Sequence, residues 1–274
     1  MTQSLDLGRL QRALASAPIR FELRSFSQVS STQDLVAVAA RAGAAEGLVV
    51  FADEQLSGRG RSGRSWIAPP GSSLMFSVLL RPQRDAESLT TLSLVAGLAV
   101  LEGLALSGGP PVRLKWPNDC ICRDLKLAGI LAESPASSAA GRVVVLGVGC
   151  NVTWAGSELP PELSQTATAC DLEGCLVDRT TLAEQVLSRL AIRYREWAEG
   201  GFAALRGEWL RHAAWLGQKV VAKHLPGRVV GRAVGISDVG ELIVDTADGP
   251  VPIAAGELEL SPGPQLRLAK GVAG

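Results

Sequence analysis

The chain has little of what would mark a nucleic-acid-binding or secreted protein. Lys plus Arg and Asp plus Glu number 27 each, so the net charge is zero with neutral histidines. Because dedicated duplex-DNA binders usually carry a strong basic excess, this balance argues against DNA binding. The stretch from Met1 to Leu10 lacks a basic head followed by an apolar run, so no signal peptide is predicted.

Long apolar runs and disulfide spacings are also missing. The longest apolar stretch, Leu92 to Leu106, is interrupted by Glu102 and is too short to span a bilayer, so we expect a buried helix and no membrane partner. The cysteines are odd in number and have neither disulfide-framework nor zinc-site spacing. They are Cys120, Cys122, Cys150, Cys170 and Cys175. Reduced thiols in a cytoplasm are the simplest account, so a cytoplasmic location is predicted.

Local patterns predict an α/β fold with a β-rich tail. Helices are expected at about 32–42, 92–106, 181–199 and 202–216, with a capping box at Thr181–Glu184. Strands are expected at 47–52, 74–80, 112–116, 126–133 and 143–149, and the segment 156–176 reads as a loop. Short strands follow at 219–223, 228–236, 241–245, 250–253 and 257–260, a spacing typical of a small barrel or sandwich. We expect domains at 1–216 and 217–264, and a flexible tail at 265–274.

The segment from Gly58 to Trp66 alternates three arginines with three glycines and ends in tryptophan. Glycine lets the backbone take positive φ and approach a ligand closely. Each arginine adds a fixed positive charge and a planar fork of donors that suits carboxylate or phosphate. Such a loop is suited to closing around a small anion, although a solvated basic loop would read the same way.

A second motif runs from Lys115 to Asp119 (Lys-Trp-Pro-Asn-Asp) and is followed by the apolar strand Lys126 to Leu131. Taken alone, the first part is an ordinary turn, because proline presets φ and Asn and Asp bond their own backbone. The combination indicates more than a turn. The strand begins with a lysine and carries Gly129, where a ligand could approach the backbone.

These motifs, in this order, resemble the biotin protein ligases, also called biotin–acetyl-CoA-carboxylase synthetases. Ser31-Thr32 and Gly149-x-Asn151-Val152 add two weaker matches. The resemblance implies a mixed, largely antiparallel sheet with flanking helices, followed by a small C-terminal β-barrel. It also implies a two-step reaction: biotin and ATP form biotinyl-5′-AMP, and a lysine of a biotin carboxyl carrier protein then takes the biotinyl group. ATP and Mg²⁺ would serve as co-substrate and activator, without a permanently bound cofactor.

The resemblance carries roles to individual residues. Lys126 is expected to hold the biotin carboxylate and the α-phosphate together, with Arg59 and Arg61 as further catalytic cations, because fixed charges offset the repulsion between two anions. Biotin contacts are expected from Ser31, Thr32, Gln33, Gln55, Gly58, Arg59, Gly60, Arg61, Lys126 and Gly129. Nucleotide contacts are expected from Arg64, Trp66, Asn118 and Asn151, and Asp119 is a candidate for orienting the amine or holding metal.

Some of these residues also have plain structural readings. Ser31 or Thr32 could simply cap a helix, Trp66 could anchor the loop, and Gln33 stands where the family usually has asparagine, so a backbone role is the safer expectation there. We expect residues 58–66 to be mobile without ligand and to close over biotin, which would exclude water.

Two rival functions remain at this point. A lipoate–protein ligase would share the adenylate chemistry, but the polar residues Ser31, Thr32 and Gln55 favour a ureido ring over an apolar tail. A nucleic-acid binder would leave the second motif unexplained. Too few residues precede the matched region for the DNA-binding domain of some family members, so no DNA partner is expected, and no residue decides whether the chain forms a homodimer.

Overall fold

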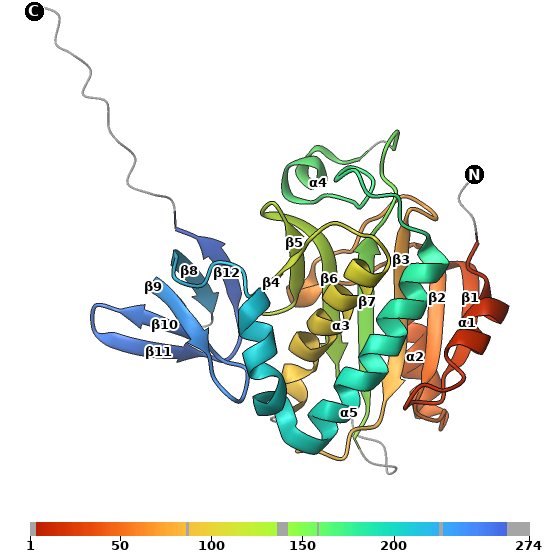
Figure 1. The fold of residues 1–274 in the computed structure, drawn as a ribbon, viewed down its shortest axis with the longest axis horizontal. Coiled ribbons are helices and arrows are strands. Elements are labelled where there is room, and N and C mark those ends of the chain that lie inside the picture. Colours follow the sequence, from red (N-terminus) through yellow and green to blue (C-terminus); the bar gives the residue numbers. More distant parts are fainter. Residues whose placement is uncertain (1–3, 86–87, 136–141, 158, 225–226, 262–274) are drawn as a thin grey trace, which may run out of the picture.

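A seven-stranded mixed sheet organises the first three quarters of the chain in the computed structural model, which describes residues 4–85, 88–135, 142–157, 159–224 and 227–261 (Figure 1). The strand order is β1-β2-β3-β7-β6-β5-β4. Only β1 and β2 pair in parallel, and the other neighbours are antiparallel, as predicted. The strands are β1 (Glu22–Val29), β2 (Leu48–Gln55), β3 (Ser73–Leu80), β4 (Arg113–Lys115), β5 (Asp119–Cys122), β6 (Leu125–Glu133) and β7 (Val144–Asn151).

Side chains alternate between the two faces of each buried strand, so both faces of this sheet are apolar. Helices cover both faces and remove this apolar surface from water. On β2, Val49 faces the large core beneath α3 (Leu92–Leu106) and α5 (Arg179–His212), whereas Val50 faces α2 (Thr32–Arg41). Ser88–Leu106 is long and apolar enough to cross a membrane, but 61% of its most apolar 18-residue stretch is buried inside the protein. It is therefore a core helix, which confirms the expectation for Leu92–Leu106.

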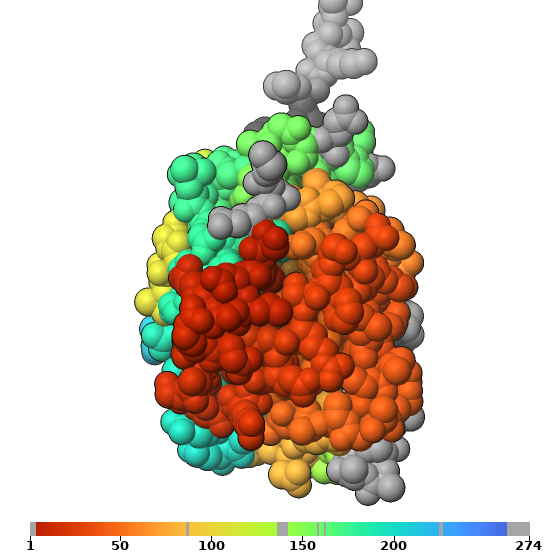
Figure 2. All heavy atoms as spheres, turned by 90° about the vertical axis from the view of Figure 1, so that its right-hand side faces the viewer, coloured from red at the N-terminus to blue at the C-terminus, as the bar shows by residue number. Residues whose placement is uncertain are grey.

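The remaining elements lie at the edges of the molecule. Helix α1 (Leu7–Ala13) packs against β1 and α5, and the N-terminal segments form the face seen in Figure 2. Short helices occupy α4 (Pro161–Thr166), η1 (Arg61–Gly63) and η2 (Ser88–Thr91). Sequence patterns missed α1, β1, α4 and β5. The sequence patterns did not predict strand β1 because six of its eight residues are exposed and most of them are polar.

A five-stranded antiparallel sheet follows, in the order β11-β10-β9-β8-β12 (Figure 1). All five predicted strands are present: β8 (Lys219–His224), β9 (Gly227–Ile236), β10 (Leu242–Thr246), β11 (Gly249–Ile253) and β12 (Glu257–Leu260). Within the described ranges no pairing joins β11 to β12, so barrel closure stays a prediction. The expected flexible tail at 265–274 lies outside the described residues.

Helix α5 corrects one prediction about where a helix begins. Its N-cap is Asp178, whose side chain accepts from the backbone N–H of Thr181, so Thr181–Glu184 is not the capping box. Asp178 reaches the orphan amide groups first because the chain already turns helical at Arg179. Gly201, with φ of 70°, has a non-helical backbone, so α5 consists of two helical segments that meet at a kink, which confirms the predicted break at Gly200–Gly201.

The Asp178 cap should contribute stability that depends on pH. Asp178→Ala is expected to lower the free energy of unfolding by about 1 kcal/mol at neutral pH. Burial acts to raise the pKa of Asp178, but hydrogen bonds from Thr181 and the charge of Arg9 outweigh it and lower the pKa. A lowered folded pKa gives stability above the unfolded pKa, about 3.9, that is lost as pH falls through the folded value.

Urea unfolding of wild type and Asp178→Ala at neutral and strongly acidic pH measures this effect. The gap between them should shrink in acid. Asp178→Asn, which keeps the capping oxygen without the charge, is the control and should remain close to wild type at neutral pH. An Ala-to-wild-type gap that is equal at both pH values would contradict the assignment.

Candidate active site

The floor of the candidate site consists of three glycines on the α2 side of the sheet. Gly147 and Gly149 alternate along β7, and Gly129 on β6 pairs with Gly149. A Cβ on Gly147 would lie 2.9 Å from Gln33 Oε1, and one on Gly149 would lie 2.5 Å from the Trp66 ring. The strip therefore lets other groups pack directly on the backbone of the sheet.

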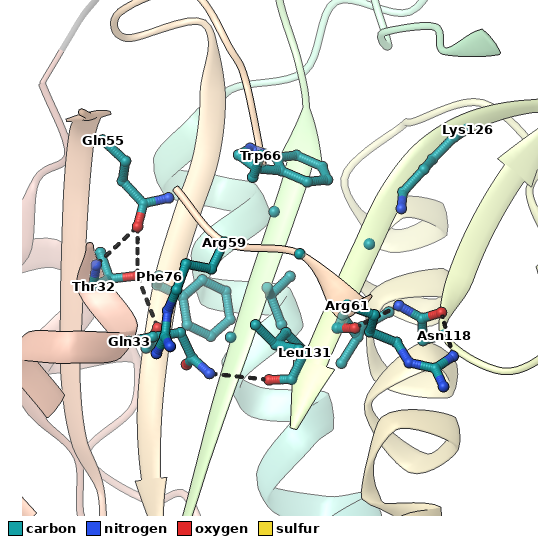
Figure 3. A pocket seen from close by; sticks show the side chains of 17 residues that line it. Thr32, Gln33, Gln55, Arg59, Arg61, Trp66, Phe76, Asn118, Lys126 and Leu131 are labelled. Carbon is teal, nitrogen blue, oxygen red and sulfur yellow. Dashed lines mark hydrogen bonds between the residues drawn. The ribbon is translucent and has the colours of Figure 1, made fainter. Parts of the chain in front are cut away.

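The beginning of α2 supplies one wall. Ser31 occupies the N-cap position, yet its side chain makes no capping hydrogen bond, and its fully buried hydroxyl has no partner among the described residues. Gln55 takes over the capping role, since its Oε1 accepts from the Thr32 backbone N–H at 2.8 Å and from the Thr32 hydroxyl at 3.1 Å (Figure 3). Thr32 Oγ1 also lies 2.8 Å from Ser77 Oγ. The Ser31 hydroxyl is therefore not needed to cap α2.

The amide of Gln33 has a fixed orientation. Its Nε2 lies 3.1 Å from Glu133 Oε2, 3.4 Å from the Val145 carbonyl and 3.5 Å from the Leu131 carbonyl. All three neighbours are acceptors, so the NH₂ group must face them. The buried Oε1 lies over Gly147 and has no hydrogen-bond partner in the part of the chain that the structure describes. This oxygen can therefore accept a hydrogen bond from a bound ligand.

Residues 58–66, here called the flap, form a small hairpin over the floor. Arg59 and Ser65 make an antiparallel bridge, and the Gly60 N–H donates to the Arg64 carbonyl at 2.7 Å. Gly63, with φ of 75°, provides the turn at its tip. The Trp66 indole lies on Gly129 and Gly149. Its buried Nε1–H has no hydrogen-bond partner within the described ranges.

Two cations lie next to the floor. Lys126 Nζ is 2.7 Å from an Asp119 carboxylate oxygen and 5.7 Å from the centre of the Trp66 ring. Arg61 Nη1 donates to Asn118 Oδ1 at 3.3 Å and to the Gly256 carbonyl at 3.4 Å. Burial lowers the pKa of Arg61 because its charge is partly removed from water, although the Asp119 carboxylate opposes this. An anion bound near Arg61 would stabilise the charged guanidinium and so offset the loss of hydration on burial.

The other two flap arginines are neutralised by carboxylates. Arg59 Nη2 lies 2.8 Å from Glu133 and 3.0 Å from Asp34, and Arg64 pairs with Glu257 of the C-terminal sheet. Both ion pairs are largely exposed to solvent. These contacts tie the flap to α2, to β6 and to the C-terminal sheet.

The structure brings together ten of the fifteen predicted site residues as the lining of one pocket. They are Thr32, Gln33, Gln55, Arg59, Gly60, Arg61, Trp66, Asn118, Lys126 and Gly129. Ser31, Gly58, Arg64, Asp119 and Asn151 do not line it. The Asn151 amide is buried and bonded to Ser73 Oγ and the Thr168 carbonyl.

Sequence reasoning missed part of the same lining: Phe76, Ser77, Ile130, Leu131, Gly147, Val148 and Gly149. The alternation of Gly147 and Gly149 inside an apolar strand was the available signal, because glycine in a strand interior marks a close backbone approach. Among the described residues, no group of three or more His, Cys, Asp or Glu side chains could hold a metal ion.

Sequence profiles match two segments of the chain. Residues 25–151 match the biotin/lipoate A/B protein ligase family, and residues 216–261 match the biotin protein ligase C-terminal domain. The first segment contains the glycine floor, the flap and both central cations. The second begins where the C-terminal sheet begins.

Similar proteins agree with these profiles. The biotin–[acetyl-CoA-carboxylase] ligase of Mycobacterium tuberculosis is 38% identical over 244 residues, covering 86% of this chain and 88% of the relative. The bifunctional ligase/repressor BirA of Bacillus subtilis is 33% identical over 257 residues, covering 90% and 79%. The structure of the Aquifex aeolicus biotin protein ligase in complex with biotin and ATP superposes with a TM-score of 0.77 at 31% identity, covering 88% of this chain and 99% of that one. The chain belongs to the biotin protein ligase family.

Proposed function

We propose that this site joins biotin to ATP and then passes the biotinyl group to a lysine of a carrier protein of the acyl-CoA carboxylase type. The observation that carries the proposal is a set of buried polar atoms that lack partners among the described residues, Ser31 Oγ, Gln33 Oε1 and Trp66 Nε1, beside two cations. Buried polar groups are normally satisfied, so such a set indicates a ligand that supplies the missing partners.

The first step brings two anions together. A biotin carboxylate oxygen attacks the α-phosphorus of ATP, the bond to the bridging oxygen breaks, and pyrophosphate leaves. Two unit charges about 4 Å apart repel by about 4 kcal/mol at an effective dielectric near 20. Lys126 and Arg61 offset this repulsion from fixed positions on β6 and the flap, with the Gly129 N–H and Gly60 at the carboxylate.

In the second step the carrier lysine amine attacks the anhydride carbonyl, and AMP leaves with the bonding electron pair. Asp119 is placed beside Lys126 and is the candidate for orienting that amine. Trp66 would stack on the adenine, a contact worth about 1–3 kcal/mol. Arg64, Asn118 and Asn151 remain candidate nucleotide contacts, although Asn151 would have to give up its present bonds.

Recognition of a ureido ring explains the polar wall. Ser31, Gln33 and the Thr32–Gln55 pair offer donors and acceptors where lipoate has only a disulfide ring. A site built to hydrogen-bond its substrate rejects an analogue that lacks those groups, because its buried polar atoms stay unpaired. Biotin is therefore favoured over lipoate.

Mg²⁺ belongs to the proposal as a companion of ATP. Magnesium commonly takes most of its oxygen ligands from water and substrate phosphates, with one or two carboxylates. Asp119 is the nearby carboxylate and is already paired with Lys126. We therefore assign most of the metal's ligands to the nucleotide.

Other parts of the proposal concern the whole chain. Residues 1–216 would form the catalytic domain and 217–264 a small barrel whose Gly256 and Glu257 steady the flap arginines. A cytoplasmic location and the absence of DNA and membrane partners complete it, and the mass of the protein in solution decides between a monomer and a homodimer.

The function is tested by incubating the purified chain with MgATP and either biotin or lipoate, followed by mass spectrometry. Biotinyl-AMP should form with biotin alone, and addition of a biotin carboxyl carrier domain should give one biotinylated lysine. Formation of lipoyl-AMP in preference to biotinyl-AMP would favour the lipoate–protein ligase alternative instead.

A further inference from the structure

One carboxylate oxygen joins the wall at the beginning of α2 to the flap. Glu133, the last residue of β6, presents Oε2 to Gln33 Nε2 at 3.1 Å and to Arg59 Nη2 at 2.8 Å. Gln33 belongs to the wall at the beginning of α2, and Arg59 belongs to the flap. Glu133 is 38% exposed in its side chain, so it lies at the rim of the site.

The Gln33 amide depends on this carboxylate for its orientation. The bonds from Nε2 to the Val145 and Leu131 carbonyls are long, at 3.4 and 3.5 Å, so the charged acceptor at 3.1 Å is the strongest of the three. With Nε2 held, Oε1 faces the glycine floor as a pure acceptor. Without Glu133 the amide could turn and present a donor instead.

Arg59 depends on the same carboxylate for its position. Its guanidinium faces Glu133 and Asp34, so its charge is already matched by two carboxylates. Arg61 has no ion-pair partner within the described ranges. Arg59 is thus better placed to fasten the flap than to stabilise charge on a reacting phosphate, which revises the catalytic role predicted for it.

We propose that Glu133 is a positioning residue that couples recognition of an N–H donor on the substrate to closure of the flap. The inference rests on the proposed function, in which that donor is a ureido N–H of biotin. A donor bound to Gln33 Oε1 polarises the amide and strengthens its bond to Glu133, which holds Arg59 and keeps the flap down. Asp34 contributes to the fastening alone, because its carboxylate contacts Arg59 and, among the described residues, forms no hydrogen bond with the Gln33 amide.

Two readouts separate these roles. The first is discrimination, measured as the ratio of kcat/KM for biotin to that for N-methylbiotin, which lacks one ureido N–H. The second is hydrogen-exchange protection of residues 58–66 when biotin is bound. Glu133→Ala should reduce discrimination about tenfold, the size of a lost charge-assisted hydrogen bond, and should also reduce flap protection. Asp34→Ala should reduce flap protection and leave discrimination unchanged.

Glu54→Ala is the matched control. Glu54 also accepts from a glutamine, Gln28 Nε2 at 2.7 Å, but lies outside the pocket lining. It should match wild type in both readouts. Glu133→Gln, which keeps an acceptor oxygen without charge, should retain most discrimination and lose flap protection, and it serves if the alanine variant does not fold.

The two readouts in these variants either support or overturn the proposed coupling between Gln33 and the flap. Loss of both readouts in Glu133→Ala, with the split seen in Asp34→Ala and in Glu133→Gln, supports the coupling. Discrimination that survives in Glu133→Ala, or wild-type behaviour of Glu133→Gln in both readouts, overturns it. If wild-type protein forms no biotinyl-AMP, the proposed function fails instead, and the coupling falls with it.

Discussion

Lys126→Met is expected to slow formation of biotinyl-AMP by about two to three orders of magnitude, the usual cost of removing one preorganised charge at a reacting centre. The substitution keeps the length of the side chain and its packing near Trp66 but removes the ammonium 2.7 Å from Asp119. Asp119 then loses the ion-pair partner at 2.7 Å, and its negative charge is less well balanced beside two anionic substrates. Both effects act in the same direction.

Single-turnover mixing of enzyme, biotin and MgATP, with quenching and quantification of biotinyl-AMP, measures this rate. Lys219→Met removes an exposed lysine at the start of β8 and is the control, expected to match wild type. A Lys126→Met rate within about threefold of wild type would remove Lys126 from the chemical step, since a tenfold change corresponds to about 1.4 kcal/mol.

Gly147→Val is expected to weaken biotin capture, seen as kcat/KM for biotin, by about a hundredfold. A Cβ at this position already lies 2.9 Å from Gln33 Oε1 and 3.4 Å from Ser77 Oγ. The branched side chain would fill the floor and push the Gln33 acceptor aside. Overpacking of this kind costs about 1–3 kcal/mol, and the upper end corresponds to a hundredfold.

The effect should be specific to the floor. Gly235→Val on β9 is the control, because no atom lies within 4 Å of a Cβ placed there. It should leave biotin kinetics unchanged. If Gly147→Val kept wild-type kcat/KM for biotin while remaining folded by thermal melting, the glycine strip would not be the binding floor.

The buried parts of the fold were predictable because continuous apolar runs report burial. The patterns for Leu92–Leu106 and the strand at 143–149 match α3 and β7 closely. Strand β1 escaped because an exposed edge strand has no apolar face. The start of α5 was misplaced because Asp178 and Thr181 are both good caps, and only the backbone angles distinguish them.

The sequence predicted which residues belong to the site, but not how these residues contact one another. Motif order identified Lys126, Arg61 and Gln55, which all line the pocket. The glycine floor needed the register of β6 on β7, and the pairing of Arg59 with Glu133 joins residues 74 positions apart. Such long-range pairings leave no local pattern in one sequence.

The central claim is that this site condenses a biotin carboxylate with the α-phosphate of ATP, and the reverse of that step tests it most directly. Purified protein should exchange labelled pyrophosphate into ATP when biotin and Mg²⁺ are present, and the exchange should stop when biotin is omitted. Absence of exchange with biotin, or equal exchange without it, would contradict the account.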